Sequence, residues 1–170
     1  MIKINDKVLY GIHGVCTVVD CVTKRVGNKD MEYYVLKPMF DRGSTVFVPK
    51  NNEALVGKMK RIMSADEIYE MIQSMPEEDL LWIENESDRR RQFSEILGSG
   101  DRAQLVRLIK TLYVRQQRRI EQKKGLLLSD EKFMKDAERI LYEEFAYVLQ
   151  IERDQVLPFI NRQIEVDRKE

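Results

Sequence analysis

Apolar residues alternate with polar ones along residues 6–49, and the pattern changes to a helical one after residue 63. Alternation places every second side chain on one face of a strand, whereas spacings of three and four residues mark one face of a helix. Pro49 ends the last strand, because proline has no N–H to donate to a neighbouring strand. We therefore expect a small antiparallel sheet that curls into an SH3-like barrel. Its strands should cover residues 7–10, 15–26, 31–36 and 44–48, with a tight turn at 27–30 and a closing segment at 59–63.

The rest of the chain carries the signals of about five helices. Ser64 and Glu67 form the pattern of a capping box, which starts the first helix. The helices expected after it run from about 79 to 97, from 101 to 124, from a cap at Ser129 onwards, and near 155–168. The apolar connector 126–128 should be buried. The predicted fold class is α+β, with a β domain at residues 1–63 and a helical domain at residues 64–170.

Several classes of protein are disfavoured by what the sequence lacks. No apolar run approaches the roughly 18–20 residues needed to span a bilayer, and residues 1–6 do not resemble a secretory signal, so we expect a cytoplasmic protein without a membrane partner. There is one histidine, His13, and no glycine-rich phosphate loop, so we predict no catalytic residues, cofactor or small-molecule substrate. Cys16 and Cys21 are five apart on one strand and should face opposite sides, which predicts neither a disulfide nor a metal site.

Charge is sorted along the chain although Lys/Arg and Asp/Glu both number 29. Residues 64–98 carry 3 Lys/Arg against 10 Asp/Glu, whereas residues 99–125 carry 8 against 2. The cations of the third expected helix lie outside its apolar stripe, and they are Arg107, Lys110, Arg115, Arg118, Arg119, Lys123 and Lys124. Such cations can bind a phosphate backbone without reading base sequence. A solvated face, or pairing with the acidic neighbouring helices, is the open alternative.

Arg89, Arg90 and Arg91 form a second cationic feature, in the second expected helix. Consecutive residues fan around a helix, so at most two of the three can face one partner. The sole tryptophan, Trp82, precedes them. It could wedge against a DNA base, as apolar side chains do in minor-groove binders, or it could be part of the core.

Short motifs in a fixed order resemble a known family. Residues 6–15, DKVLYGIHGV, resemble an opening of the form GD-x-V-x-Y-x-x-HG-V, and residues 32–36 resemble its EYYVL strand. Residues 45–49, TVFVP, and the helix break at 99–101, SGD, also match. Together these motifs resemble the bacterial CarD-like (CarD/CdnL) transcription regulators, which share their N-terminal module with transcription-repair coupling factor.

The resemblance implies a non-enzymatic regulator with two parts. A Tudor-like module would bind the β subunit of RNA polymerase, and a helical domain would contact promoter DNA just upstream of the −10 element. Binding both at once would change the stability of the open complex. Lys24 falls where the family has a polymerase-contacting cation, with Arg25 beside it. Phe47 occupies the place of a second polymerase-contacting arginine, two residues before Pro49, so that contact would be apolar here. The predicted polymerase-binding residues are Lys24, Arg25, Phe47 and Pro49.

The helical domain carries the predicted DNA contacts. Counting back from residues 99–101 places Glu86 where the family has its wedge tryptophan, and Trp82 lies one helical turn earlier. The predicted DNA-binding residues are Arg89, Arg90, Arg91, Trp82, Arg115, Arg118 and Arg119. The competing function is a protein–protein adaptor that binds polymerase or another protein without touching DNA. We expect a monomer, with a strand-swapped dimer as the alternative.

Overall fold

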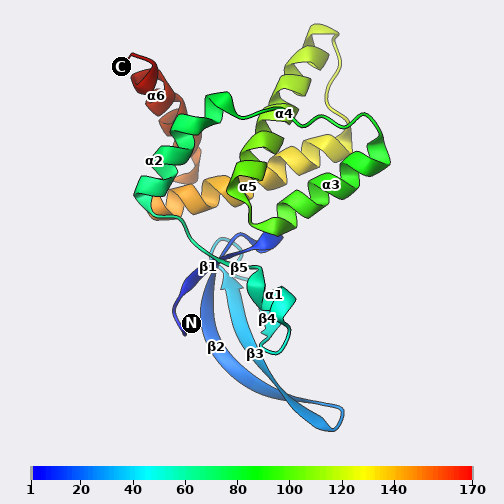
Figure 1. Cartoon of the computed structure of the whole chain (residues 1–170), viewed down its shortest axis with the longest axis vertical. Coiled ribbons are helices and arrows are strands. Elements are labelled where there is room, and N and C mark those ends of the chain that lie inside the picture. The colour runs from blue at the N-terminus through cyan, green and yellow to red at the C-terminus, as the bar shows by residue number, and fades with distance from the viewer. Residues whose placement is uncertain (1, 170) are drawn as a thin grey trace. The chain divides into compact units, whose positions relative to one another are not determined.

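The computed structural model describes residues 2–169, with the side chains as far as residue 166. The chain divides into two compact units, Met1–Ile62 and Met63–Glu170. Within the described residues, the first unit holds a five-stranded antiparallel sheet and the second holds five α-helices (Figure 1). The predicted α+β class is confirmed. Among the residues that the structure describes, no helix combines the length and the apolar character that crossing a bilayer requires.

The strands in the sheet follow the order β4-β3-β2-β1-β5, and β4 is an edge strand (Figure 1). Gly27 and Asn28 form the two-residue turn between β2 and β3, and Gly27 adopts the positive φ (63°) that such turns require. The expected strands are confirmed, whereas closure into a Tudor-like barrel stays a prediction. The elements of this unit are β1 (Lys7–Tyr10), the 3₁₀ turn η1 (Gly11–His13), β2 (Val15–Val26), β3 (Lys29–Pro38), β4 (Val46–Pro49), α1 (Glu53–Gly57) and β5 (Met59–Arg61).

A bulge in β2 changes which residues face the core of this unit. Val18 pairs with Leu36 but Asp20 pairs with Val35, so one extra residue is inserted in β2. Cys21 therefore lies opposite Tyr34, which packs on the same core as Cys16. The two cysteines share one face, and the prediction of opposite faces is wrong because it assumed unbroken alternation. Both thiols are free.

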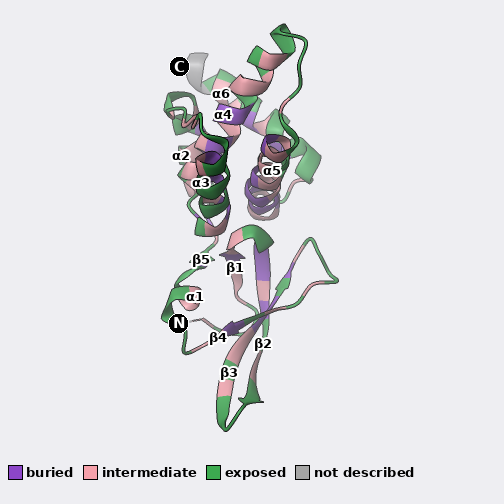
Figure 2. Ribbon diagram, turned by 90° about the vertical axis from the view of Figure 1, so that its right-hand side faces the viewer, coloured by how far each residue is buried: buried purple, intermediate pink, exposed green. Residues whose placement is uncertain are grey.

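Helix α5 is central to the second unit, because α2, α3, α4 and α6 all pack against it. The elements here are α2 (Ala65–Ser74), the 3₁₀ turn η2 (Met75–Glu77), α3 (Glu86–Ser99), α4 (Arg102–Glu121), α5 (Leu128–Leu149), the 3₁₀ turn η3 (Arg153–Gln155) and α6 (Val156–Lys169). The predicted capping box is confirmed, since Ser64 and Glu67 each accept the other's backbone N–H. Buried side chains follow the inward faces of the helices (Figure 2), and they include Ile68, Ile72, Val106, Leu141, Phe145, Val156 and Ile160.

Helix α3 begins later than the sequence predicts. The expected start near residue 79 is wrong, because residues 78–85 have no regular structure and the helix begins at Glu86. The side chain of Asn85 caps it by accepting the backbone N–H of Asp88 at 3.0 Å. The residues before it pack along α4 instead, where the Leu81 N–H donates to the Thr111 hydroxyl at 2.9 Å.

The leucines of the connector between α4 and α5 are not buried, so that prediction is also wrong. Leu128 is 85% exposed and Leu127 is 42% exposed. Figure 1 shows the end of α4 extending past α3 and α5 before the chain returns to the start of α5. The cap of α5 also lies two residues before the expected Ser129, at Leu127, and no side-chain hydrogen bond is made there.

Candidate protein- and DNA-binding surfaces

One face of the β2–β3–β4 sheet brings together three of the four residues predicted to contact polymerase. The Lys24 ammonium lies 3.6 Å from the centroid of the Phe47 ring, and Tyr33 meets the same ring edge-on at 6.2 Å. Phe47 is 43% exposed, and Pro49 lies opposite Tyr33 in the register. Arg25 is also exposed but follows Lys24 in β2, so alternation places it on the other face. The result is an exposed patch of a cation, aromatic rings and a proline.

Trp82 is held between two arginines of the helical unit. The guanidinium carbons of Arg89 and Arg115 each lie 4.5 Å from its ring. Both contacts are cation–π interactions, which keep the indole from projecting into solvent as a free wedge. The indole Nε1 is buried without a hydrogen-bond partner among the described residues. Trp82 thus lies half-buried in the irregular segment before α3.

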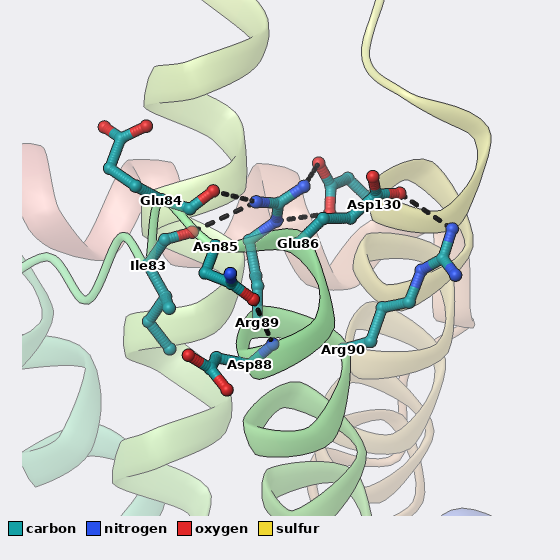
Figure 3. Close-up of polar contacts among 8 residues, drawn as sticks. All are labelled: Ile83, Glu84, Asn85, Glu86, Asp88, Arg89, Arg90 and Asp130. Carbon is teal, nitrogen blue, oxygen red and sulfur yellow. Dashed lines mark hydrogen bonds and ion pairs between the residues drawn. The ribbon is translucent and has the colours of Figure 1, made fainter.

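Arg89 is an interior residue, 3% exposed, and its guanidinium donates four hydrogen bonds (Figure 3). Its Nε and Nη2 donate to the two carboxylate oxygens of Asp130 at 3.0 and 3.2 Å. Its Nη1 donates to the carbonyls of Ile83 and Glu84 at 3.0 and 3.2 Å. This side chain ties α3 to the start of α5 and to the preceding segment, so it is not presented to a phosphate.

Arg90 and Arg91 have the opposite character. Their side chains are 57% and 65% exposed, and each pairs with one carboxylate on its own helix. Arg90 donates to Glu86 at 2.7 Å and Arg91 to Asp88 at 3.3 Å. Such exposed pairs are worth little and exchange readily with water. These two arginines can therefore be recruited by an external anion.

Most cations of α4 are engaged inside the helical unit. Arg107 donates to the Asp79 carbonyl at 3.1 Å, and Lys110 donates to the Pro76 and Glu78 carbonyls at 2.9 and 2.7 Å. Arg119 donates to the Gly125 carbonyl. Arg115 stacks on Trp82, as described above. Of the basic set, the side chains with no hydrogen bond, ion pair or cation–π contact in the described part of the chain are those of Arg118, Lys123 and Lys124, and all three are exposed.

We expect Arg115→Ala to lower the free energy of unfolding by about 1 kcal/mol, since it removes one of the two cation–π contacts to Trp82. It should also increase acrylamide quenching of the sole tryptophan. Urea unfolding and fluorescence quenching measure both effects. Arg118→Ala, on the same helix but exposed, is the control and should change neither; equal behaviour of the two variants would contradict the stacking role.

Two protein-family models match the chain. The model described as the CarD-like/TRCF RID domain matches residues 2–63, and the model described as the CarD C-terminal domain matches residues 67–161. The second match alone covers more than half of the chain. The chain belongs to the CarD-like family. CarD-like proteins are transcription regulators that interact with RNA polymerase, and membership of the family implies the same general function for this chain.

The sequence did not lead us to predict the buried acidic residues of this CarD-like chain that pair with arginines. Glu144 is 0% exposed and accepts two hydrogen bonds from the Arg102 guanidinium, at 2.9 and 2.5 Å. It also accepts the Met63 backbone N–H at 3.0 Å. A signal for it exists, because Glu144 lies in the same apolar stripe as Leu141 and Val148. A carboxylate in an inward stripe indicates a buried ion pair.

Three more groups on α5 of the CarD-like helical unit are perturbed by burial. Burial raises the pKa values of Glu138 and Glu143. Arg153 counteracts the increase in the pKa of Glu138, and Arg139, followed by Arg153, counteracts it in Glu143. Burial, together with the charge of Glu138, raises the pKa of Tyr142 to about 12. Among the described residues, no group of three His, Cys, Asp or Glu side chains could hold a metal ion.

Proposed function

We propose that this CarD-like chain binds the β subunit of RNA polymerase through residues 1–63 and promoter DNA near the upstream edge of the −10 element through residues 64–170. Binding both partners at once changes the stability of the open complex, without chemical catalysis. Two tethered contacts gain affinity from their effective concentration, so each can be weak alone. The chain acts as a monomer in the cytoplasm.

The exposed patch around Phe47 is the observation that supports the polymerase contact. Its ring is exposed, is covered on one side by the Lys24 ammonium and lies on the edge strand β4. Edge strands can add a partner's strand through main-chain hydrogen bonds, while neighbouring side chains provide specificity. Arg25 contributes positive charge from the opposite face of the β2–β3 hairpin.

The exposed arginines support the DNA contact. Arg90, Arg91 and Arg118 present guanidinium groups that phosphates can bind in place of weak internal pairs or water. Arg89, Arg115 and Arg119 are not among the proposed DNA-binding residues because their guanidinium groups already have partners. Trp82 lies against Arg89 of α3 and Arg115 of α4, so it connects the two helices that carry the exposed arginines.

An adaptor that never touches DNA is the second candidate. One observation favours it: most of the α4 cations hold the protein's own backbone or Trp82, so less positive charge faces outward than the sequence suggests. An adaptor would bind polymerase or another protein without contacting DNA. The two functions differ in whether the effect of the protein on the open complex depends on the exposed arginines.

The test is the lifetime of the open complex formed by cognate polymerase on a linear promoter. We expect wild-type protein to change this lifetime and the variant Arg90→Ala/Arg91→Ala/Arg118→Ala to lose most of the effect while still binding polymerase. The salt dependence of DNA binding, as the slope of log K against log salt, should weaken by about 0.9 for each phosphate that the variant no longer neutralises. Lys132→Ala, an exposed cation on α5, is the matched control. A full effect from the triple variant would favour the adaptor.

The polymerase contact has its own prediction. Phe47→Ala should weaken binding to the isolated β subunit about tenfold, because a central aromatic side chain of an interface often carries more than 1 kcal/mol. Val26→Ala, which removes an exposed apolar side chain near the tip of the β2–β3 hairpin, should change binding little. Titration calorimetry measures both. If the two variants weaken binding equally, Phe47 is not a central contact with the β subunit.

A further inference from the structure

A hollow in the helical unit is separate from the surfaces proposed above. It lies where η2, α4, α5 and α6 meet, and its volume is about 410 Å³. Its floor is made by Val106, Leu141 and Ile160, which are at most 6% exposed. Tyr113 and Leu157, which also line it, are 54% and 47% exposed. Small-molecule sites commonly have volumes of about 300–1,000 Å³ and mostly apolar walls.

The polar groups of this hollow are few, and they are not equally available. Lys110 lines it, but its ammonium donates to the carbonyls of Met75, Pro76 and Glu78 at 3.4, 2.9 and 2.7 Å. An ammonium has three protons to donate, so this cation has none left for an anionic ligand. Only the aliphatic part of Lys110 can serve as a wall for a ligand.

Glu138 is the charged group that stays available. It lines the hollow together with Tyr142 and Asn161, and its carboxylate has no hydrogen bond or ion pair within the described residues. The cation that acts on it is Arg153, which lines a neighbouring hollow and not this one. The free charge at this apolar site is therefore negative.

We propose that this hollow binds a small apolar monoamine, with its hydrocarbon body on the Val106–Leu141–Ile160 floor and its ammonium at the Glu138 carboxylate and the Tyr142 hydroxyl. An apolar anion is disfavoured because it would face Glu138 with no available cation. A neutral apolar molecule would fill the floor but leave the carboxylate without a partner. The proposal does not depend on DNA or polymerase binding.

The protonation of these groups supports the same ligand. Burial raises the pKa of Glu138, which means that the carboxylate has lost solvation and would gain from a cation beside it. The pKa of Tyr142, about 12, keeps the phenol protonated near neutral pH. Its oxygen can then accept a hydrogen bond from an ammonium.

The test compares three probes with the same six-carbon chain and different head groups: hexylamine, hexanol and hexanoate. Each is titrated into the full chain and followed by ¹H–¹⁵N chemical-shift changes. We expect hexylamine to bind about tenfold tighter than hexanol, as a charge-assisted hydrogen bond can provide, and hexanoate to bind most weakly. Shifts should concentrate on the residues that line the hollow. No saturable binding, or equal affinities for all three probes, would overturn the proposal.

Two variants locate the binding. Glu138→Gln should remove the preference for hexylamine over hexanol, whereas Glu95→Gln, the same change at an exposed position on α3, should leave it intact. Leu157→Trp adds bulk at a lining residue that is 47% exposed, so it should weaken the binding of all three probes in a protein that keeps its fold. If Glu138→Gln keeps the preference for the amine, or if Leu157→Trp binds all probes as wild type does, the ligand lies elsewhere and the proposal fails.

Discussion

Replacing Arg89 with alanine is expected to lower the free energy of unfolding of the helical unit by about 3–5 kcal/mol, because it leaves a buried carboxylate without its partner. Asp130 is 2% exposed, so water cannot replace the missing guanidinium without opening the packing between α3 and α5. The carbonyls of Ile83 and Glu84 lose their donor in the same substitution. One side chain therefore maintains three separate connections.

The neighbouring residue provides a matched control. Arg90→Ala makes the same chemical change in the same helix at a position that is 57% exposed, and it should cost about 1 kcal/mol or less. Urea unfolding followed by helical circular dichroism compares the two variants. If Arg89→Ala and Arg90→Ala lower the free energy of unfolding by similar amounts, the Arg89–Asp130 pair does not stabilise the helical unit as proposed. The double variant Arg89→Met/Asp130→Leu should recover much of the stability, because it removes both buried charges.

Glu144→Ala should have the second largest effect, about 3 kcal/mol or more. It leaves the Arg102 guanidinium, 13% exposed, with a cavity where its carboxylate was, and it removes the acceptor of the Met63 N–H. Glu144→Gln keeps the size and an acceptor oxygen but removes the charge, so its cost should be smaller.

Hydrogen exchange adds a local measurement to the unfolding experiment for Glu144. Protection of the Met63 amide should fall in Glu144→Ala by more than protection falls elsewhere in the unit, since this amide donates directly to the carboxylate that is removed. Glu95→Ala, at an exposed position on α3, is the control and should change neither stability nor exchange. An unchanged Met63 amide in Glu144→Ala would rule out the carboxylate as its anchor.

The β unit was largely predictable because its signals are local. Alternation, the turn at Gly27 and the stop at Pro49 each act within a few residues, and the observed strands agree with them closely. The late start of α3 depends instead on residues far along the chain. Thr111, Arg107 and Lys110 satisfy the backbone of the segment before α3, and they follow it by about thirty residues. Local propensity has no access to such partners.

The candidate surfaces were predictable in part for a similar reason. The run of Arg89, Arg90 and Arg91 looks uniform in sequence, but helical geometry gives each residue a different direction. Arg89 shares its face with Phe93 and Leu97, which are buried, so spacing by four residues could have identified it as internal. The exposed state of the leucine connector had no comparable signal, because apolar composition alone predicts burial.

The way in which α4 holds the segment before α3 also affects how freely the two can vary. Arg107 and Lys110 donate to main-chain carbonyls of Met75, Pro76, Glu78 and Asp79. Every amino acid supplies a carbonyl, so substitutions at these four acceptor positions leave the hydrogen bonds in place. The donors have no such freedom, since only a long cationic side chain can reach. These hydrogen bonds therefore restrict the two donor positions on α4, but they place no demand on the side chains of their acceptors in η2 and in the irregular residues that follow it.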